Sequence, residues 1–200
     1  MTLLLWICFW GALLELDTTY AFQLTFSRGI VAGPLLGLVC GNVMTGLQVG
    51  IFTELLFIDV SPLGGALPPS AAICCALTMA LVSLQIPVYF AFFVGVLGAI
   101  LFAQVELYMR RRRSAWMARQ EQKIRRNPAY IRHCVAEALS LSFMTNLAFL
   151  LVLSTGVGFA LAQLVAVLPE KMQLAGKFSY MAVPWIGLST LLSTFRLKTR

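Results

Sequence analysis

Residues 30–70 read IVAGPLLGLVCGNVMTGLQVGIFTELLFIDVSPLGGALPPS, an almost wholly apolar stretch that is crowded with glycine and ends in a Pro-Pro turn. Two carboxylates, Glu54 and Asp59, lie inside its apolar part. An ionisable side chain within a membrane-length apolar segment is costly, so it usually faces a protected polar cavity such as a solute or ion pathway. Gly/Pro-interrupted segments at membrane depth are tolerated mainly where they line such a cavity. The stretch therefore predicts a transport protein of the membrane.

The composition of the whole chain indicates the same class of protein. Of the 200 residues, 60% are hydrophobic and only 12% are charged, and the mean hydropathy is +0.85. Soluble domains have about a quarter of their residues charged, so we predict an all-α, polytopic membrane helix bundle with a re-entrant Gly/Pro-rich segment. Each crossing needs about 20 apolar residues, which allows roughly four to six crossings or partial crossings in a single membrane domain. This domain spans residues 1–200.

The apolar and basic residues divide this domain into three expected parts. Residues 1–109 form an N-terminal membrane half with the re-entrant segment, and residues 138–196 form C-terminal membrane helices. Residues 110–132 hold nine of the fifteen Lys and Arg, which predicts a basic cytoplasmic loop that attracts anionic membrane lipids. Its apolar spacing indicates a surface helix within the loop. Because this cluster directly follows apolar sequence, nucleic acid is not an expected partner. The run 71–109 is either two helices or one kinked, tilted helix.

Polar residues within and just before this stretch are the candidate binding site. Glu54 is the sharpest candidate, because few cations are available within the membrane to neutralise it. The alternative is a structural acid tied to a backbone group or a basic partner. Neutral amides and hydroxyls nearby suit a polyhydroxylated solute, since each sugar hydroxyl both donates and accepts a hydrogen bond. The expected substrate-binding residues are Glu54, Gln48, Thr53, Ser70, Asp59, Asp17, Gln23 and Asn42.

Asp59 and the upstream Arg28 each have a structural alternative. Asp59 lies just ahead of Ser61-Pro62, so it is either part of the site, or a helix cap or a residue at the membrane interface. Arg28 belongs to a second polar cluster with Asp17 and Gln23, and it is either an interfacial residue or a functional one.

The sequence shows no motif for covalent chemistry. It contains no Walker loop, dinucleotide fingerprint, zincin pattern or nucleophile elbow. The five cysteines are mostly embedded in apolar sequence without metal-ligand spacing, and the chain has one histidine. We therefore expect no catalytic residue, no metal and no cofactor, and a protein that is not itself an enzyme. The N-terminus lacks a basic region and a cleavage pattern, so it is expected to form a first membrane helix rather than a signal peptide.

Four segments carry a family resemblance. They are SRGIVAGPLLGLVCGN at 27–42, TGLQVG at 45–50, TEL at 53–55 and GGALPP at 64–69. Together they resemble the IIC membrane subunit of the mannose/sorbose family of bacterial sugar phosphotransferase systems. Glu54 falls on the family's motif glutamate, and Asp17 and Gln23 fall on its upstream acidic and glutamine positions. The chain departs from the family pattern at Gly29 (usually proline), Asn42 (often aspartate), Asp59 (commonly a small residue) and Ser70 (aspartate).

The resemblance implies a sugar-translocating subunit that crosses the bacterial inner (plasma) membrane several times. Its implied partners are a IID membrane subunit and cytoplasmic IIA and IIB subunits, which perform the phosphoenolpyruvate-dependent phosphoryl transfer. Relative to the family, the chain is expected to be shortened at its C-terminus. The alternative is a shortened IIC-like protein with an assembly or regulatory role and no transport of its own. Glycines repeated along one helix face favour close helix association, so an oligomer is expected.

Overall fold

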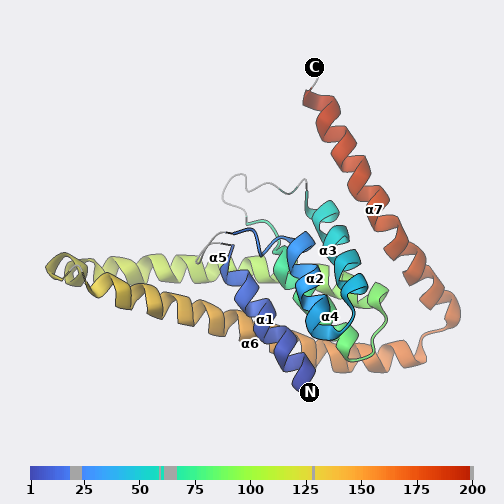
Figure 1. The fold of residues 1–200 in the computed structure, drawn as a ribbon, viewed down its shortest axis with the longest axis horizontal. Helices are drawn as coiled ribbons and strands as arrows, with labels where there is room; N and C mark the ends of the chain where they lie inside the picture. The colour runs from blue at the N-terminus through green and yellow to red at the C-terminus, as the bar shows by residue number, and fades with distance from the viewer. Residues whose placement is uncertain (19–23, 59, 61–66, 128, 199–200) are drawn as a thin grey trace.

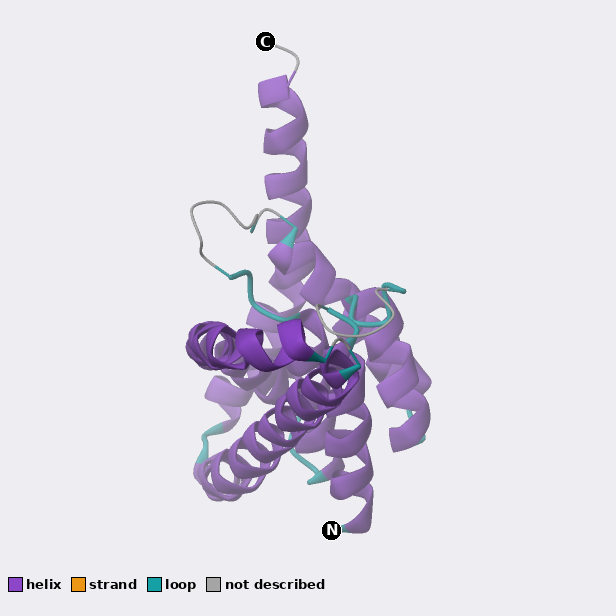
Figure 2. Cartoon of the chain, turned by 90° about the vertical axis from the view of Figure 1, so that its left-hand side faces the viewer, coloured by secondary structure: helices purple, strands orange, loops and turns teal. Residues whose placement is uncertain are grey.

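The computed structural model describes residues 1–18, 24–58, 60, 67–127 and 129–198. Within these ranges the chain is helical and contains no strand (Figure 2), which confirms the predicted all-α membrane bundle. Residues 61–66 of the expected re-entrant segment lie outside the described residues. The helices, shown in Figure 1, are α1 (Thr2–Leu16), α2 (Gly29–Cys40), α3 (Val43–Phe57), α4 (Ala71–Ser83), α5 (Val88–Arg126), α6 (Tyr130–Val167) and α7 (Glu170–Lys198).

Helix α4 lies at the centre of the bundle. It packs against α1, α2, α3, α5 and α6, and residues 72–81 are all buried. A helix that is apolar on every side is stable only where every side is covered. The hydroxyl of Thr78 in this stretch donates to the carbonyl of Cys74 at 2.8 Å, so it adds no unpaired donor to the core. Residues 67–70, which lead into α4, are themselves partly or fully exposed, so the buried part begins within the helix.

Helices α2 and α3 form a closely packed hairpin. A Cβ atom built on Gly33 would lie 2.8 Å from the Cα of Gly50, so only glycine allows the two backbones to approach this far. Gly41 ends α2 with φ of 74°, in the left-handed region that favours glycine. Asn42 then caps α3 by accepting a hydrogen bond from the amide of Thr45 at 3.2 Å. This hairpin is the close packing that the glycine spacing predicts.

The apolar run 71–109 is divided between two helices. Helix α4 ends at Ser83 and α5 begins at Val88, and Pro87 stands just before α5, where its missing N–H costs no helical hydrogen bond. Gln85, in the connection, has a φ of 65°. Of the two alternatives drawn from the sequence, the structure shows two helices.

The basic segment contains a helix, as its apolar spacing indicated, but this helix is a continuation of α5. Residues 110–126 are helical and continue α5 without a break, so that α5 and α6 form a long hairpin projecting from the bundle (Figure 1). Arginine, glutamine, methionine and alanine are good helix formers. The i,i+4 ion pairs Glu106–Arg110 and Glu121–Arg125 add to the stability of the helix. The helix ends before Asn127, and Pro128 follows in the sequence, which disfavours helical backbone at the preceding residue.

The outer helices present apolar surface. Helices α5 (over Val88–Glu121) and α6 are long and apolar enough to cross a membrane, and only 17% of the most apolar window of α6 is buried in the bundle. Large exposed apolar side chains also follow α7, among them Phe178, Trp185 and Leu192. Such surface is stable against lipid or a partner subunit.

Candidate functional site

Glu54 and the start of α2 form a partly open polar site. From the last turn of α3, the Glu54 Oε1 accepts a hydrogen bond from the amide of Gly29 at 2.7 Å. The Nη1 of Arg28 lies 3.5 Å from the Glu54 Oε2. The first amides of a helix have no acceptor within the helix, and its dipole favours a negative charge there. The side chains of Glu54 and Arg28 are 26% and 66% exposed, so this ion pair is not sealed within the bundle.

The glycine at position 29 makes the contact with Glu54 possible. A Cβ atom at this position would lie 2.8 Å from the carbonyl oxygen of Gly50 and 3.3 Å from the Cγ of Glu54. Proline, which the resembled family usually has here, carries no backbone N–H. In this chain Gly29 therefore gives Glu54 a hydrogen-bond donor that proline could not supply.

The surroundings of Glu54 combine features of both roles considered for it. It has a backbone donor and a basic partner, as a structural acid would have, and it remains partly exposed, as a binding residue must be. Arg28 supplies a cation that the sequence argument did not place near Glu54. The α2–α3 hairpin brings the two residues together, because the end of α3 returns to the start of α2.

Ser70 joins the start of α4 to α1. Its hydroxyl accepts a hydrogen bond from the amide of Ile73 at 3.2 Å, which caps α4, and it donates a short hydrogen bond to the Oε2 of Glu15. Glu15 is only 6% exposed. The sequence prediction named Ser70 but missed Glu15, although an acid near the end of an apolar helix was a usable signal.

Asp17 orders the chain that leads to α2. Its side chain is buried and follows directly after α1. The Oδ1 accepts a hydrogen bond from the amide of Leu24 at 2.9 Å, and the Oδ2 lies 3.4 Å from the amide of Ser27. Aspartate oxygens commonly stabilise turns in this way. In this conformation Asp17 therefore supports the backbone next to Arg28.

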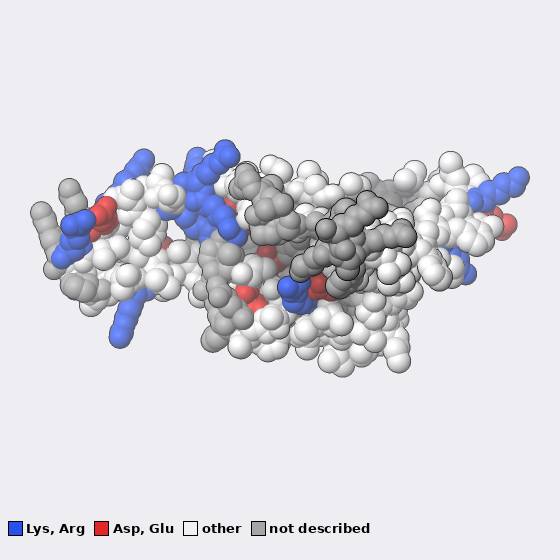
Figure 3. Space-filling view, turned by 90° about the horizontal axis from the view of Figure 1, so that it is seen from above, with Lys and Arg blue, Asp and Glu red and all other residues white. Residues whose placement is uncertain are grey.

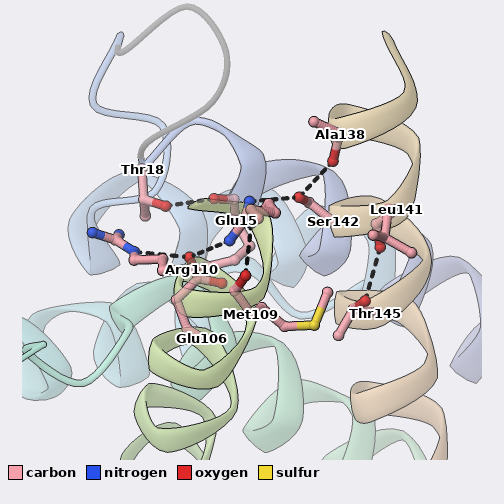
Figure 4. A network of polar contacts seen from close by, with 10 residues as sticks. Glu15, Thr18, Glu106, Met109, Arg110, Ala138, Leu141, Ser142 and Thr145 are labelled. Carbon is pink, nitrogen blue, oxygen red and sulfur yellow. Dashed lines mark hydrogen bonds and ion pairs between the residues drawn. The ribbon is translucent and has the colours of Figure 1, made fainter. Parts of the chain in front are cut away.

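A polar network lies where the end of α1, at Glu15, meets α5 and α6 (Figure 4). The Glu106 Oε1 accepts from the Nε of Arg110 at 3.0 Å and from the Nη2 of Arg113 at 2.9 Å. The Nη1 of Arg113 donates to the Oγ of Ser142 on α6 at 2.9 Å. Glu15 lies beside Glu106 and Arg110 in Figure 4, and both act on it electrostatically. The region around Ser70 is thus joined through α1 to the base of the long hairpin.

The remaining predicted residues occupy different environments. Thr53 is fully buried between α3 and α4, and its hydroxyl donates to the carbonyl of Val49 at 2.8 Å. Gln48 is exposed. It precedes Glu54 on α3 by one and two-thirds turns, which is about 9 Å along the helix axis. Asn42 caps the opposite end of α3, about 18 Å along the axis from Glu54. Asp59 and Gln23 lie outside the described residues.

Comparisons with known proteins identify relatives of the chain. The model of the family described as "PTS system sorbose-specific IIC component" matches residues 1–199. The "Putative N-acetylgalactosamine permease IIC component 2" of Escherichia coli (strain K12) is 46% identical over 46 residues. That match covers 23% of this chain and 35%, about a third, of the relative. A solved structure titled "Structure of membrane protein" has the same fold, with a TM-score of 0.78 at 18% identity. The match covers 98% of this chain and 80% of that one.

Proposed function

The chain belongs to the family of sorbose-specific IIC components of the phosphotransferase system, a family of membrane permease subunits, and on that premise we propose a specific role for it. The protein is the sugar-translocating subunit of a mannose/sorbose-type, phosphoenolpyruvate-dependent system. It binds the sugar and passes it on for phosphorylation by partner subunits. Its location is the bacterial inner membrane, which it crosses several times.

The observation that carries this proposal is the partly open carboxylate of Glu54. A carboxylate has about four acceptor positions, and the described contacts with Gly29 and Arg28 occupy two of its directions. The remaining lone pairs can accept from sugar hydroxyls, and the exposed guanidinium of Arg28 can donate to hydroxyl oxygens. Because these groups are held by the α2–α3 hairpin, they need little rearrangement to meet a solute.

The other subunits have separate roles in this proposal. The cytoplasmic IIA and IIB subunits carry the phosphoryl group, and the IID subunit completes the pathway in the membrane. The exposed apolar faces of α6 and α7 suit lipid or the IID subunit, and the complex is expected to be oligomeric. Gln48, exposed on the same helix as Glu54, is a further contact for a sugar as it moves.

The test is Glu54→Gln in a complete complex with the IIA, IIB and IID subunits in proteoliposomes. Glutamine keeps an acceptor for the Gly29 amide, so the fold is expected to survive. The loss of a charge-assisted bond to the sugar lowers uptake and phosphorylation roughly ten- to a hundredfold. Uptake is measured with a panel of labelled sugars that includes sorbose, mannose and N-acetylgalactosamine.

The matched control is Glu121→Gln, which removes the same charge from an exposed side chain on α5. It should leave uptake unchanged. If the Glu54 variant transports at the full rate while its complex is intact, Glu54 is not a binding residue. If the unmodified chain assembles with IID but no sugar of the panel enters, the assembly or regulatory role replaces the transport role.

A further inference from the structure

A basic cleft lies between α5 and α6, where the apolar part of both helices ends. Its volume is about 780 Å³. Its lining combines basic, aromatic, acidic and apolar side chains: Arg112, Arg113, Trp116, Arg119, Glu137 and Leu141. Figure 3 shows that Lys and Arg gather mainly over the part of the molecule occupied by this hairpin. The cleft is separate from the site around Glu54.

The charges of the cleft favour an anion. Its lining holds three arginines and one acid, Glu137, and although Glu106 pairs with Arg113, the exposed Arg112 and Arg119 still outnumber that acid. Arg113 is fixed by Glu106 and Ser142 and is only 14% exposed on its side chain. Arg112 lies over the ring of Tyr108, with its Cζ 5.1 Å from the centroid. The nitrogens of Arg113 already donate to the protein, whereas Arg112 and Arg119 are exposed, and their planar donors match the geometry of phosphate oxygens.

The length of the apolar part of α5 fits a position of the cleft at the level of a lipid headgroup. The part of α5 from Val88 to Met109 has 22 residues and is apolar except for Gln104 and Glu106. At 1.5 Å per residue it is about 33 Å long, close to the thickness of the hydrocarbon core. The arginine run begins at the next residue. Basic side chains and a tryptophan at this level are typical of the membrane–water interface.

A shallow apolar groove, open on its outer side and lined by residues of α6 alone, continues from the cleft along the apolar part of this helix. It follows α6 along Met144, Thr145, Phe149 and Val152, and its volume is about 580 Å³. Thr145 lines both the cleft and the groove. A free phosphate ion would use only the basic part, whereas a ligand with a phosphate and an acyl chain would fill both.

We propose that the α5–α6 cleft is a specific site for an anionic phospholipid. The lipid phosphate binds to the exposed guanidinium groups of Arg112 and Arg119, beside the internally bonded Arg113, and one acyl chain lies in the groove along α6. The bound lipid thereby fills the space between the two helices of the projecting hairpin. Through Arg113, the site adjoins the network that joins α5 to Glu15 and Ser70. The proposal depends on the chain lying in a membrane and does not depend on sugar transport.

The test is native mass spectrometry of the full chain in detergent, titrated with phosphatidylglycerol or with phosphatidylcholine of the same acyl chains. We expect one phosphatidylglycerol to bind with clear preference. Arg112→Gln combined with Arg119→Gln should weaken it by about fivefold per arginine, or about 25-fold together. Arg113 is left in place, because it also belongs to the internal network. Glu137→Gln should strengthen binding, since it removes the acid of the cleft.

A matched double variant, Arg111→Gln with Arg125→Gln, removes two charges from exposed positions of α5 outside the cleft lining. It should keep the preference for phosphatidylglycerol. Equal binding of both lipids, or an equal loss in the matched variant, overturns the proposal in favour of a diffuse charge effect. Displacement of the lipid by millimolar glycerol phosphate as effectively as by short-chain phosphatidylglycerol would show a phosphate site and not a lipid site. If phosphatidylglycerol shows no preference while an acidic cytoplasmic subunit binds and the Arg112/Arg119 variant abolishes that binding, the cleft is a protein-docking site.

Discussion

Ser70→Ala tests whether the start of α4 is tied to α1. The Ser70 hydroxyl accepts from the amide of Ile73 and donates to the carboxylate of Glu15, so alanine removes two contacts at one position. The alanine side chain introduces no steric conflict, because it is smaller than serine. The expected result is a less stable protein with an unchanged helical content.

The size of the effect follows from these two contacts. Loss of a serine cap costs about 1 kcal/mol. Loss of the second contact leaves the Glu15 side chain, only 6% exposed, without its hydroxyl partner and with little water to replace it, which costs about 1–3 kcal/mol. The free energy of unfolding should therefore fall by about 2–4 kcal/mol.

The assay is equilibrium unfolding in mixed detergent micelles, followed by circular dichroism. A double-mutant cycle with Glu15→Ala separates the two contacts, because only the contact between Ser70 and Glu15 contributes to the coupling. We expect a coupling energy of about 1–3 kcal/mol, with the cap effect present in both backgrounds. Ser189→Ala is the control, since this exposed hydroxyl on α7 bonds to the carbonyl of Ile186 and should cost less than about 0.5 kcal/mol.

Additive effects of Ser70→Ala and Glu15→Ala would refute the reasoning. They would mean that the hydroxyl and the carboxylate do not interact in the folded protein. A loss for Ser70→Ala no greater than that for Ser189→Ala would also refute the assigned cap.

Two further predictions concern packing and charge. Gly33→Ala places a methyl group against the backbone of α3 and should separate the α2–α3 hairpin, lowering the yield of folded protein. Gly156→Ala is its control, because nothing lies within 4 Å of the added carbon, and it should stabilise α6 by about 0.5–1 kcal/mol. Arg113→Gln breaks contacts with the partly buried acid of α5 and the hydroxyl on α6, and should cost about 2–3 kcal/mol of unfolding free energy. Arg125→Gln is the control for Arg113→Gln. It breaks the exposed ion pair between Arg125 and Glu121 and should lower the free energy of unfolding by at most about 0.5 kcal/mol. The same unfolding assay measures all four variants. An equal loss of unfolding free energy in Gly33→Ala and Gly156→Ala would contradict the close packing at Gly33, and an equal loss in Arg113→Gln and Arg125→Gln would contradict the contacts assigned to Arg113.

The sequence predicts those parts of the fold that depend on local chemistry. Glycines spaced by four residues specify the face on which α2 meets α3, because without side chains the two backbones can approach closely. The proline at position 87 indicates where a new helix begins. The continuity of α5 through residue 110 was not predicted, since a change from apolar to basic side chains suggests a change of environment. The helix nevertheless continues through that change, because both kinds of residue form helices well.

The polar contacts are harder to predict because their partners are distant in the chain. Arg28 and Glu54 are 26 residues apart, and Glu15 and Ser70 are 55 residues apart. Neither separation has a helical period, so no spacing rule connects the partners. Their pairing depends on how α1, α2, α3 and α4 pack together. Asp17 was found by its type and its place after an apolar helix, but its hydrogen bonds to the following backbone could not be read from type alone.

Glu15 and Glu54 differ in exposure, and this difference is the basis for the different roles proposed for them. Both are acids near the ends of apolar 15-residue helices, and the sequence gives them similar surroundings. Glu15 is covered on all sides and is held by a hydroxyl at the start of the central helix, so an exchange of its partner would disturb the core. Glu54 is held from one side by a helix terminus and faces an exposed arginine on the other, so a solute hydroxyl can replace water there without a change in packing. Glu15 is therefore suited to fix the start of α4, whereas Glu54 is suited to bind and release a solute.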